Sequence, residues 1–309
     1  MTAAASITRR FVTVEGRQVH YRRAGAGPVV VLRHESPRST SSLLPLITAL
    51  APRFTVIALD TPGYGLSEPL DLAQPTVVDY ARAFAATLDA LGIERCAVYG
   101  LHTGAAIALE LAAQAPGRVT GLVLDGLPLF TPEEQADVLA HYTPEFPPRI
   151  DGGHLAAFWS WRRDGHMYFP WYRRSLETRL NIDLSHPFVL ENSMHEGVID
   201  QMRAVPSWTV GYKAGFSYDP LPALAALACP LTVVAGEGDV LADHLDRLPQ
   251  GNPLIAAEKL PGDHLARLER IGDLLAAVSK DSTPGLPAPA PVQPRPGRLT
   301  RIGPPAGAG

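Results

Sequence analysis

A histidine occupies the centre of a motif whose spacing is associated with catalysis. Residues 100–104 are Gly-Leu-His-Thr-Gly, so His102 has a glycine two positions away on each side. The motif follows the apolar run 96–101 and precedes the alanine-rich run 103–115, which predicts a strand that turns sharply into a helix. A turn of this kind exposes a nucleophile, usually a serine. The sequence therefore predicts a nucleophile elbow with an imidazole at its centre.

The chemistry open to His102 depends on its protonation. The positive end of a helix dipole disfavours a charged imidazole, and a neutral imidazole is a nucleophile or a base near neutral pH. In one interpretation, His102 attacks an acyl group and forms an acyl-imidazole, which water then hydrolyses. In a second, it only transfers protons, together with His264. In a third, both imidazoles and a carboxylate bind a metal, but no local ligand spacing supports this. We expect neither a metal nor a cofactor.

The elements that would position this motif alternate between short apolar strands and amphipathic helices. A hairpin is predicted at 11–25. Further strands are predicted at 27–34, 54–63, 96–101, 118–126, 229–239 and 253–264, and helices at 40–51, 76–92, 103–115 and 265–279. Such alternation predicts an α/β fold with a mostly parallel sheet and helices on both faces.

Four segments, taken in their order along the chain, resemble the α/β-hydrolase superfamily. They are VVVLRHESPRSTSS, LDTPGYGLSEP, YGLHTGAAIALELA and PGDHLARLE, and the resemblance covers about residues 11–280. The D-x-P-G-x-G-x-S run from Asp60 to Ser67 and the H-x-x-P of His34 and Pro37 are most similar to the capped branch of epoxide hydrolases, haloalkane dehalogenases and small-ester hydrolases. The resemblance implies an α/β-hydrolase core with an inserted helical cap.

The resemblance also implies roles for residues outside the elbow. The family order is nucleophile, acid, histidine, which gives His102 the place of the nucleophile, Asp239 that of the acid and His264 that of the base. Asp125 occupies a second acid position found in some relatives, but the Gly-x-x-Asp spacing favours Asp239. Asp239 is also a candidate N-cap for a following helix. His34 is expected to point inward and hold its loop.

The oxyanion hole departs from the family pattern. Relatives have glycine at the position of Glu35, and a carboxylate there would destabilise a developing oxyanion unless it turns away or is protonated. The other donor would be the backbone N–H of Thr103. Ser36 stands where dehalogenases keep a halide-binding side chain, which weakens the halide interpretation. We take Glu35 and Thr103 as oxyanion-hole positions and Ser36 as a substrate contact.

Residues 130–216 differ in composition from the rest of the chain. They contain all four tryptophans. An aromatic insertion between two core strands is typical of a lid over a substrate cavity, and a packing subdomain is the alternative. Tyr168, Trp171 and Tyr172 are candidate substrate contacts, with anchoring of the cap as their alternative role. The predicted division is a core of 1–129 and 217–280, a cap of 130–216 and a tail of 281–309.

Composition narrows the classes of partner. The 309 residues are 46% apolar and 19% charged, with a net charge of −4, which predicts neither a nucleic acid nor an anionic membrane as partner. No uncharged apolar run reaches the roughly 20 residues of a membrane helix, and the N-terminus lacks the apolar core of a signal peptide. We expect a cytoplasmic protein with reduced thiols at Cys96 and Cys229. The proline-rich tail from residue 281 is expected to be disordered.

These observations lead to one hypothesis of function with two alternatives. The first is a cofactor-independent hydrolase of a small, fairly apolar ester, lactone or related acyl compound, with His102, Asp239 and His264 as its catalytic set. The second is a lyase, isomerase or cyclase in which two imidazoles transfer protons without hydrolysis. The third is a ligand-binding relative that has lost catalysis. All three take a small molecule as partner, and the oligomeric state stays open.

Overall fold

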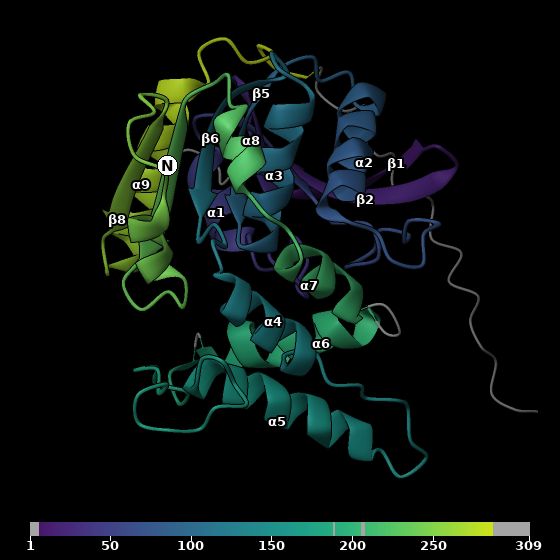
Figure 1. Ribbon diagram of the computed structural model, residues 1–309. Helices are drawn as coiled ribbons and strands as arrows, with labels where there is room; N and C mark the ends of the chain where they lie inside the picture. Colours follow the sequence, from purple (N-terminus) through teal and green to yellow (C-terminus); the bar gives the residue numbers. More distant parts are fainter. Residues whose placement is uncertain (1–5, 188, 205–207, 287–309) are drawn as a thin grey trace, which may run out of the picture.

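The computed structural model describes residues 6–187, 189–204 and 208–286. Their central feature is an eight-stranded sheet in the order β1-β2-β4-β3-β5-β6-β7-β8 (Figure 1). The strands are β1 (Thr8–Val14), β2 (Arg17–Ala24), β3 (Val29–Arg33), β4 (Thr55–Leu59), β5 (Cys96–Leu101), β6 (Val119–Asp125), β7 (Leu231–Gly236) and β8 (Ile255–Leu260). β2 pairs antiparallel with β1 and β4, and the other pairs are parallel. This confirms the expected mostly parallel sheet.

Helices cover both faces of the sheet. Strands β3 and β4 are buried at every position, as parallel strands between two helical layers are. One layer contains α2 (Val77–Ala90), α3 (Thr103–Gln114) and α8 (Leu221–Ala225), and the other contains α1 (Leu44–Leu50) and α9 (His264–Val278). Alternate residues of β3 divide between the two apolar clusters, with Val29 and Val31 in one and Val30 and Leu32 in the other.

A helical insertion between β6 and α8 lies below the sheet in Figure 1. It comprises α4 (Pro132–His141), α5 (Gly153–Met167), a π-helix (Val189–His195), α6 (Glu196–Arg203) and α7 (Trp208–Phe216). Its own apolar cluster includes Phe158, Trp161 and Trp208, and Tyr64 of the core packs into it. Trp161 and Trp208 thus help to hold the cap together and attach it to the core.

Two expectations from the sequence differ from the structure. The first helix begins at Leu44 rather than near residue 40, because the hydroxyls of Ser39 and Ser41 donate to the buried carboxylate of Asp200 in the cap. The segment 281–286, expected to be disordered, is fixed to the sheet: the Thr283 carbonyl accepts a hydrogen bond from the Val29 N–H at 3.0 Å. The rest of the predicted tail, 287–309, lies outside the described residues. None of the described helices is long and apolar enough to span a membrane.

Candidate active site

The turn between β5 and α3 has the geometry of a nucleophile elbow. His102 adopts φ 47° and ψ −109°, a strained backbone conformation for a residue with a side chain. A Cβ on Gly100 would lie 2.5 Å from the Gly104 carbonyl oxygen, and a Cβ on Gly104 would lie 2.6 Å from the Arg33 carbonyl oxygen. Both glycines are therefore required by close backbone contacts, and the predicted elbow is confirmed.

The imidazole of His102 contacts the carboxylate of Asp239. Its Nε2 lies 3.1 Å from Oδ2 and 3.3 Å from Oδ1. Gly126, just after β6, makes room for the ring, because a Cβ there would lie 2.3 Å from the His102 Cδ2. No hydrogen bond to Nδ1 is found within the described part of the chain. The elbow imidazole thus forms a carboxylate-bound pair, hereafter the His102–Asp239 pair.

The pair changes the expected protonation of His102. Burial lowers the pKa of the imidazole, but the charge and hydrogen bond of Asp239, helped by Glu35 and Asp125, outweigh it and raise the value to about 9. A full negative charge at 3.1 Å also outweighs the partial charge of the helix terminus. The expectation of a neutral imidazole near neutral pH was therefore wrong: the pair favours imidazolium.

Asp239 has both of the roles considered for it. Besides contacting His102, its Oδ1 accepts the Leu241 N–H at 2.8 Å, as a capping residue does. Burial raises the pKa of Asp239, but the charge and hydrogen bond of His102 and the Leu241 N–H bring it to about 2. Asp125, the alternative acid, is buried and accepts hydrogen bonds from Tyr99 and Arg267, each at 2.8 Å. The structure thus brings Asp239, rather than Asp125, to the imidazole.

His264 lies elsewhere. It is the first residue of α9 and its side chain is exposed. It lines a second hollow, together with Arg267 and Leu268, that shares Glu35 with the cavity of His102. The imidazole that the structure shows in contact with the Asp239 carboxylate is that of His102, and the same carboxylate accepts the Leu241 N–H.

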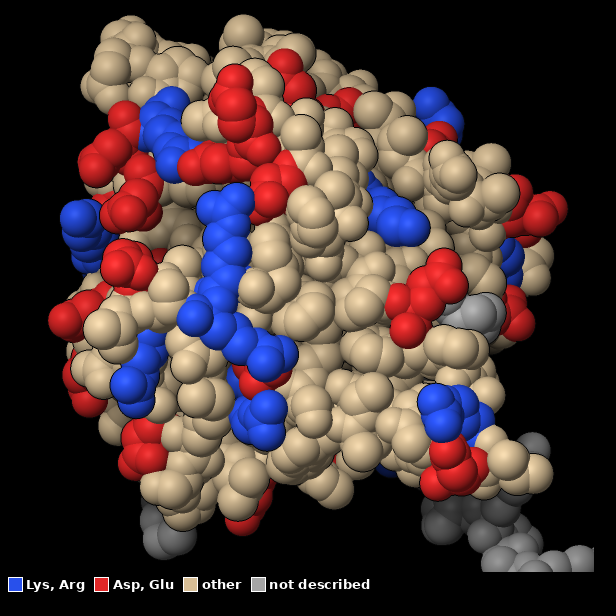
Figure 2. Space-filling model, turned by 60° about the horizontal axis from the view of Figure 1, so that its bottom comes forward, with Lys and Arg blue, Asp and Glu red and all other residues tan. Residues whose placement is uncertain are grey.

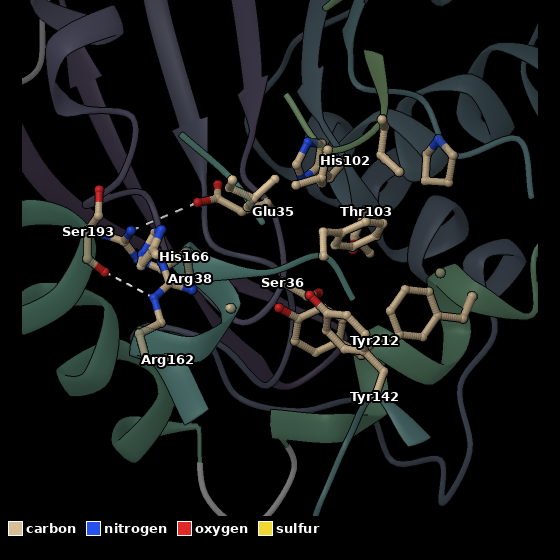
Figure 3. A pocket seen from close by; sticks show the side chains of 18 of the residues that line it. Glu35, Ser36, Arg38, His102, Thr103, Tyr142, Arg162, His166, Ser193 and Tyr212 are labelled. Atoms are coloured by element: carbon tan, nitrogen blue, oxygen red, sulfur yellow. Dashed lines mark hydrogen bonds and ion pairs between the residues drawn. The ribbon is translucent and has the colours of Figure 1, made fainter. Parts of the chain in front are cut away.

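A cavity of about 290 Å³ separates the elbow from the cap (Figure 3). His102 and Thr103 lie at one end, which we call the elbow end. Arg38, Arg162, His166 and Ser193 gather at the other, which we call the cap end. Aromatic residues line much of the wall between them, among them Phe130, Tyr142, Tyr212 and Phe216.

The predicted oxyanion-hole residues both line the cavity. Thr103 is the first residue of α3, and the first N–H groups of a helix have no acceptor within it. The Glu35 carboxylate accepts the Ser42 hydroxyl at 3.0 Å and lies 4.0 Å from the Arg38 guanidinium. Ser36 also lines the cavity. The structure thus places Glu35, Ser36 and Thr103 together with His102.

The predicted cap aromatics do not line this cavity. Trp171 donates its indole N–H to the Tyr142 carbonyl at 2.8 Å, and the Tyr172 hydroxyl donates to Asp137 at 2.5 Å. Tyr168 forms an isolated bridge with Arg179. Their contacts fit the anchoring role. Tyr142 and Tyr212, which line the cavity, were not identified from the sequence, because only the cap fold shows which aromatic residues face the core.

The buried groups beside the site hold its loops. His34 bonds through Nδ1 to the Glu35 carbonyl at 2.8 Å, and its Nε2 accepts the Thr61 N–H at 2.9 Å, so its expected inward role is confirmed. Asp60 accepts the Thr40 N–H and bonds to His20 Nδ1, each at 2.7 Å. Among the described residues, no group of three or more His, Cys, Asp and Glu side chains is arranged to hold a metal.

The comparison with family models agrees with this architecture. The model described as the alpha/beta hydrolase fold matches residues 28–256. The chain belongs to this family. The match includes β3 to β7, the elbow, the helical insertion and Asp239, whereas His264, Arg267 and Leu268 of α9 lie beyond its end.

Known relatives share only part of this hydrolase-fold chain. An uncharacterized hydrolase of Saccharomyces cerevisiae is 34% identical over 124 residues, which are 38% of this chain and 43% of the relative. Haloalkane dehalogenase 2 of Mycobacterium tuberculosis is 35% identical over 133 residues, 43% of this chain and 45% of the relative. The chain thus spans less than half the length of these relatives. The crystal structure of E-2-(acetamidomethylene)succinate hydrolase covers 88% of this chain and 99% of its own, with a TM-score of 0.66 and 19% identity, which shows the fold alone.

Proposed function

We propose that the protein is a hydrolase of a small acyl compound, an ester or a lactone, and that His102 is its general base. The observation that carries this proposal is the 3.1 Å contact between His102 Nε2 and Asp239. In a catalytic triad, a carboxylate orients the imidazole and stabilises the imidazolium that forms. Here the same two groups meet, with the imidazole supplied by the elbow. The family and the hydrolases and dehalogenase among the similar proteins support hydrolysis as the reaction class.

The proposed reaction needs no covalent intermediate. Neutral His102 takes a proton through Nδ1 from a water molecule, whose oxygen attacks the acyl carbon. The N–H of Thr103 donates to the oxyanion of the tetrahedral intermediate. The intermediate collapses, the imidazolium returns the proton to the leaving alkoxide, and acid and alcohol are released. The acyl-imidazole route needs the same neutral imidazole, with its Nε2–H donated to Asp239 and its Nδ1 lone pair free, and it stays the alternative to this route.

The raised pKa of His102 gives this proposal a testable pH dependence. Because only neutral imidazole accepts the proton, kcat/KM should rise about tenfold per pH unit below the pKa and level off near pH 9. The measurement is the hydrolysis of nitrophenyl butanoate from pH 6 to pH 10. His102→Ala provides the background of spontaneous hydrolysis at each pH. A rate above that background which is flat or falls over this range would contradict the role of His102 as base.

Glu35 favours one other candidate function, a lyase or isomerase. Its carboxylate lines the same cavity as His102 and contributes to the raised pKa of the imidazole. A carboxylate base and an imidazolium acid that line one cavity are suited to proton transfer on one substrate. In this function Glu35 would be the second proton-transfer group, a role that the sequence analysis assigned to the imidazole of His264. Heavy-oxygen water distinguishes the two: hydrolysis places the label in the product, and proton transfer alone does not.

A substitution at Glu35 separates the same two functions. In hydrolysis, Glu35→Gln should leave kcat unchanged or raise it by a few fold, because a negative charge beside the oxyanion is removed. In a lyase or isomerase, the same change should lower kcat by about a hundredfold or more, because the base is lost.

A further inference from the structure

Arg162 lacks a carboxylate partner among the described residues, unlike most arginines of the cap; Arg179 also lacks one, but it is exposed to solvent. Arg163 and Arg174 both pair with Asp164, at 2.8 and 2.7 Å, and Arg173 pairs with Asp137. On the visible face of Figure 2, which brings the bottom of Figure 1 forward, basic and acidic side chains likewise lie beside each other. Arg162 lines the cavity, and within the described part of the chain its one hydrogen bond joins Nε to the Ser193 carbonyl at 3.0 Å.

The guanidinium of Arg162 is held in place by the neighbouring helix. A Cβ on Gly197 of α6 would lie 2.8 Å from Nε and 3.1 Å from both Cζ and Nη2. The group therefore lies directly against the helix backbone, where any residue but glycine would displace it. With Nε bonded to Ser193 and one face against Gly197, the remaining N–H donors are available to a ligand in the cavity.

The surroundings of Arg162 make an anion the favoured ligand. Burial, and next the charge of Arg38, lower the pKa of Arg162, yet a guanidinium stays protonated at neutral pH. Arg38 is itself paired, with Asp200 at 3.1 Å. A partly desolvated cation without an ion pair is unfavourable, and a charge-assisted hydrogen bond from a ligand carboxylate offsets that cost.

Three further polar groups lie near this guanidinium. Burial raises the pKa of Tyr142 to about 12 and that of Tyr212 well above its usual value, so both phenols remain protonated and able to donate. Burial and the charge of Arg162 lower the pKa of His166 to about 3, which leaves it neutral. The buried His166 Nε2 has no partner among the described residues.

Glu35 sets the direction in which an anion enters. Its carboxylate lies between the elbow end and the cap end in Figure 3 and is 4.0 Å from Arg38. The positive charge of His102 is already paired with Asp239, and the charge of Glu35 also acts on that imidazole, so a negatively charged ligand group is attracted to Arg162 rather than to the elbow end. A bound molecule therefore has its carboxylate at the cap end and its other end at His102.

The geometry points to a substrate that carries two acyl groups: one free carboxylate, bound by Arg162, and one ester or lactone carbonyl, placed at His102. Only the placement of the ester or lactone carbonyl at His102 rests on the proposed hydrolase function. The first half, recognition of a carboxylate by Arg162, is a statement about binding and can be tested without turnover.

The test compares two ligands that differ in one charged group. Glutaramate has a carboxylate at one end and an amide at the other, and glutaramide has an amide at both ends. Calorimetric titration of the full chain should show glutaramate binding about tenfold or more tightly. Equal binding of the two, or no detectable binding of either, would overturn the inference.

Variants at three positions assign any preference to Arg162. Arg162→Met should abolish the preference, and Arg163→Met, the adjacent arginine of the same helix, should retain it. Gly197→Ala keeps every charge but displaces the guanidinium, and should weaken glutaramate binding by about threefold to tenfold with little change for glutaramide. Gly197→Ala also serves if Arg162→Met fails to fold. A preference that survives both Arg162→Met and Gly197→Ala would overturn the inference.

Kinetics separate failure of this inference from failure of the proposed function. If the mono-nitrophenyl ester of glutarate and nitrophenyl pentanoate are hydrolysed equally well by wild type but not by His102→Ala, the hydrolase proposal stands and carboxylate recognition falls. If glutaramate binds in an Arg162-dependent way and no ester is turned over, the recognition stands and the hydrolase proposal falls.

Discussion

The two ends of the cavity differ in how their charges are balanced. At the elbow end, the imidazole of His102 has the carboxylate of Asp239 at 3.1 Å, so its positive charge is balanced by an ion pair. At the cap end, Arg162 has a carbonyl as its hydrogen-bond partner and no carboxylate partner in the described residues, which suits it to binding an anion. This difference accords with the two proposals above, in which the reaction takes place at His102 in the core and a substrate carboxylate binds to Arg162 in the cap.

The largest expected effect concerns the imidazoles. His102→Ala should lower kcat/KM for nitrophenyl butanoate by about a hundredfold or more, the usual contribution of a general base. His264→Ala removes the exposed imidazole of the second hollow and should change kcat/KM by less than about threefold. The measurement is steady-state hydrolysis near pH 9. A larger loss in His264→Ala than in His102→Ala would contradict this account and would indicate that His264 is the base, as the family resemblance implies.

The charge balance at the elbow end should also appear in the stability of the protein. The folded pKa of His102 is raised from 6.5 to about 9, so the pair's contribution is fully present below pH 6.5 and is lost as pH rises through about 9. The excess unfolding free energy of wild type over Asp239→Asn should therefore shrink by up to roughly 3 kcal/mol across this window.

Low pH should also weaken the His102–Asp239 pair, because it protonates the carboxylate of Asp239. The folded pKa of Asp239 is lowered from 3.8 to about 2, so its contribution is present above pH 3.8 and is lost as pH falls through about 2. Urea unfolding of wild type and Asp239→Asn at several pH values measures the loss of stability at high pH, where His102 titrates, and at low pH, where Asp239 titrates. A difference between the two proteins that is independent of pH would show that the pair is uncharged.

A smaller effect is expected from crowding the imidazole. Gly126→Ala places a methyl group 2.3 Å from the His102 ring, at a residue with φ of 64°. Gly152→Ala is the matched control, because φ there is 72° and no atom lies within 4 Å of the added Cβ. Each should lose about 1 kcal/mol of unfolding free energy from the backbone conformation, and Gly126→Ala about 1–3 kcal/mol more from overpacking.

The catalytic readout of the same two variants sharpens the comparison. Gly126→Ala should lower kcat/KM by about tenfold or more, because the ring moves from its position on Asp239. Gly152→Ala, in the cap, should leave kcat/KM within about twofold of wild type. Similar losses of activity in both variants would mean that the ring has no fixed catalytic position.

The elbow end was largely predictable from the sequence, and the cap end was not. Glycines 100 and 104 and the strand–helix alternation specify a turn that has few geometric solutions, so the position of His102 followed from local pattern. The contact with Asp239 depends on two strand ends that meet at one sheet edge, and the family order anticipated the residue. The charge on His102 was predicted incorrectly, because the helix dipole was weighed without the carboxylate.

The cap end depends on packing that sequence motifs do not specify. Tyr142 and Arg162 are among several tyrosines and arginines of the insertion, and their neighbours Tyr172 and Arg163 face other partners. Only the placement of α5 against α6, with Gly197 admitting the guanidinium, identifies Arg162 as the residue in the cavity. For the same reason the sequence did not show that the imidazole in contact with Asp239 is that of His102.

The most direct test of the charged elbow is the titration of His102 itself. Nuclear magnetic resonance of protein labelled at its histidines follows each imidazole, and His102→Gln identifies the signal among the ten histidines. We expect a pKa of about 9 in wild type and a fall toward the ordinary value of 6.5 in Asp239→Asn, where the negative charge is gone. A value near 6.5 in wild type that does not respond to Asp239→Asn would contradict the pairing on which the proposed chemistry depends.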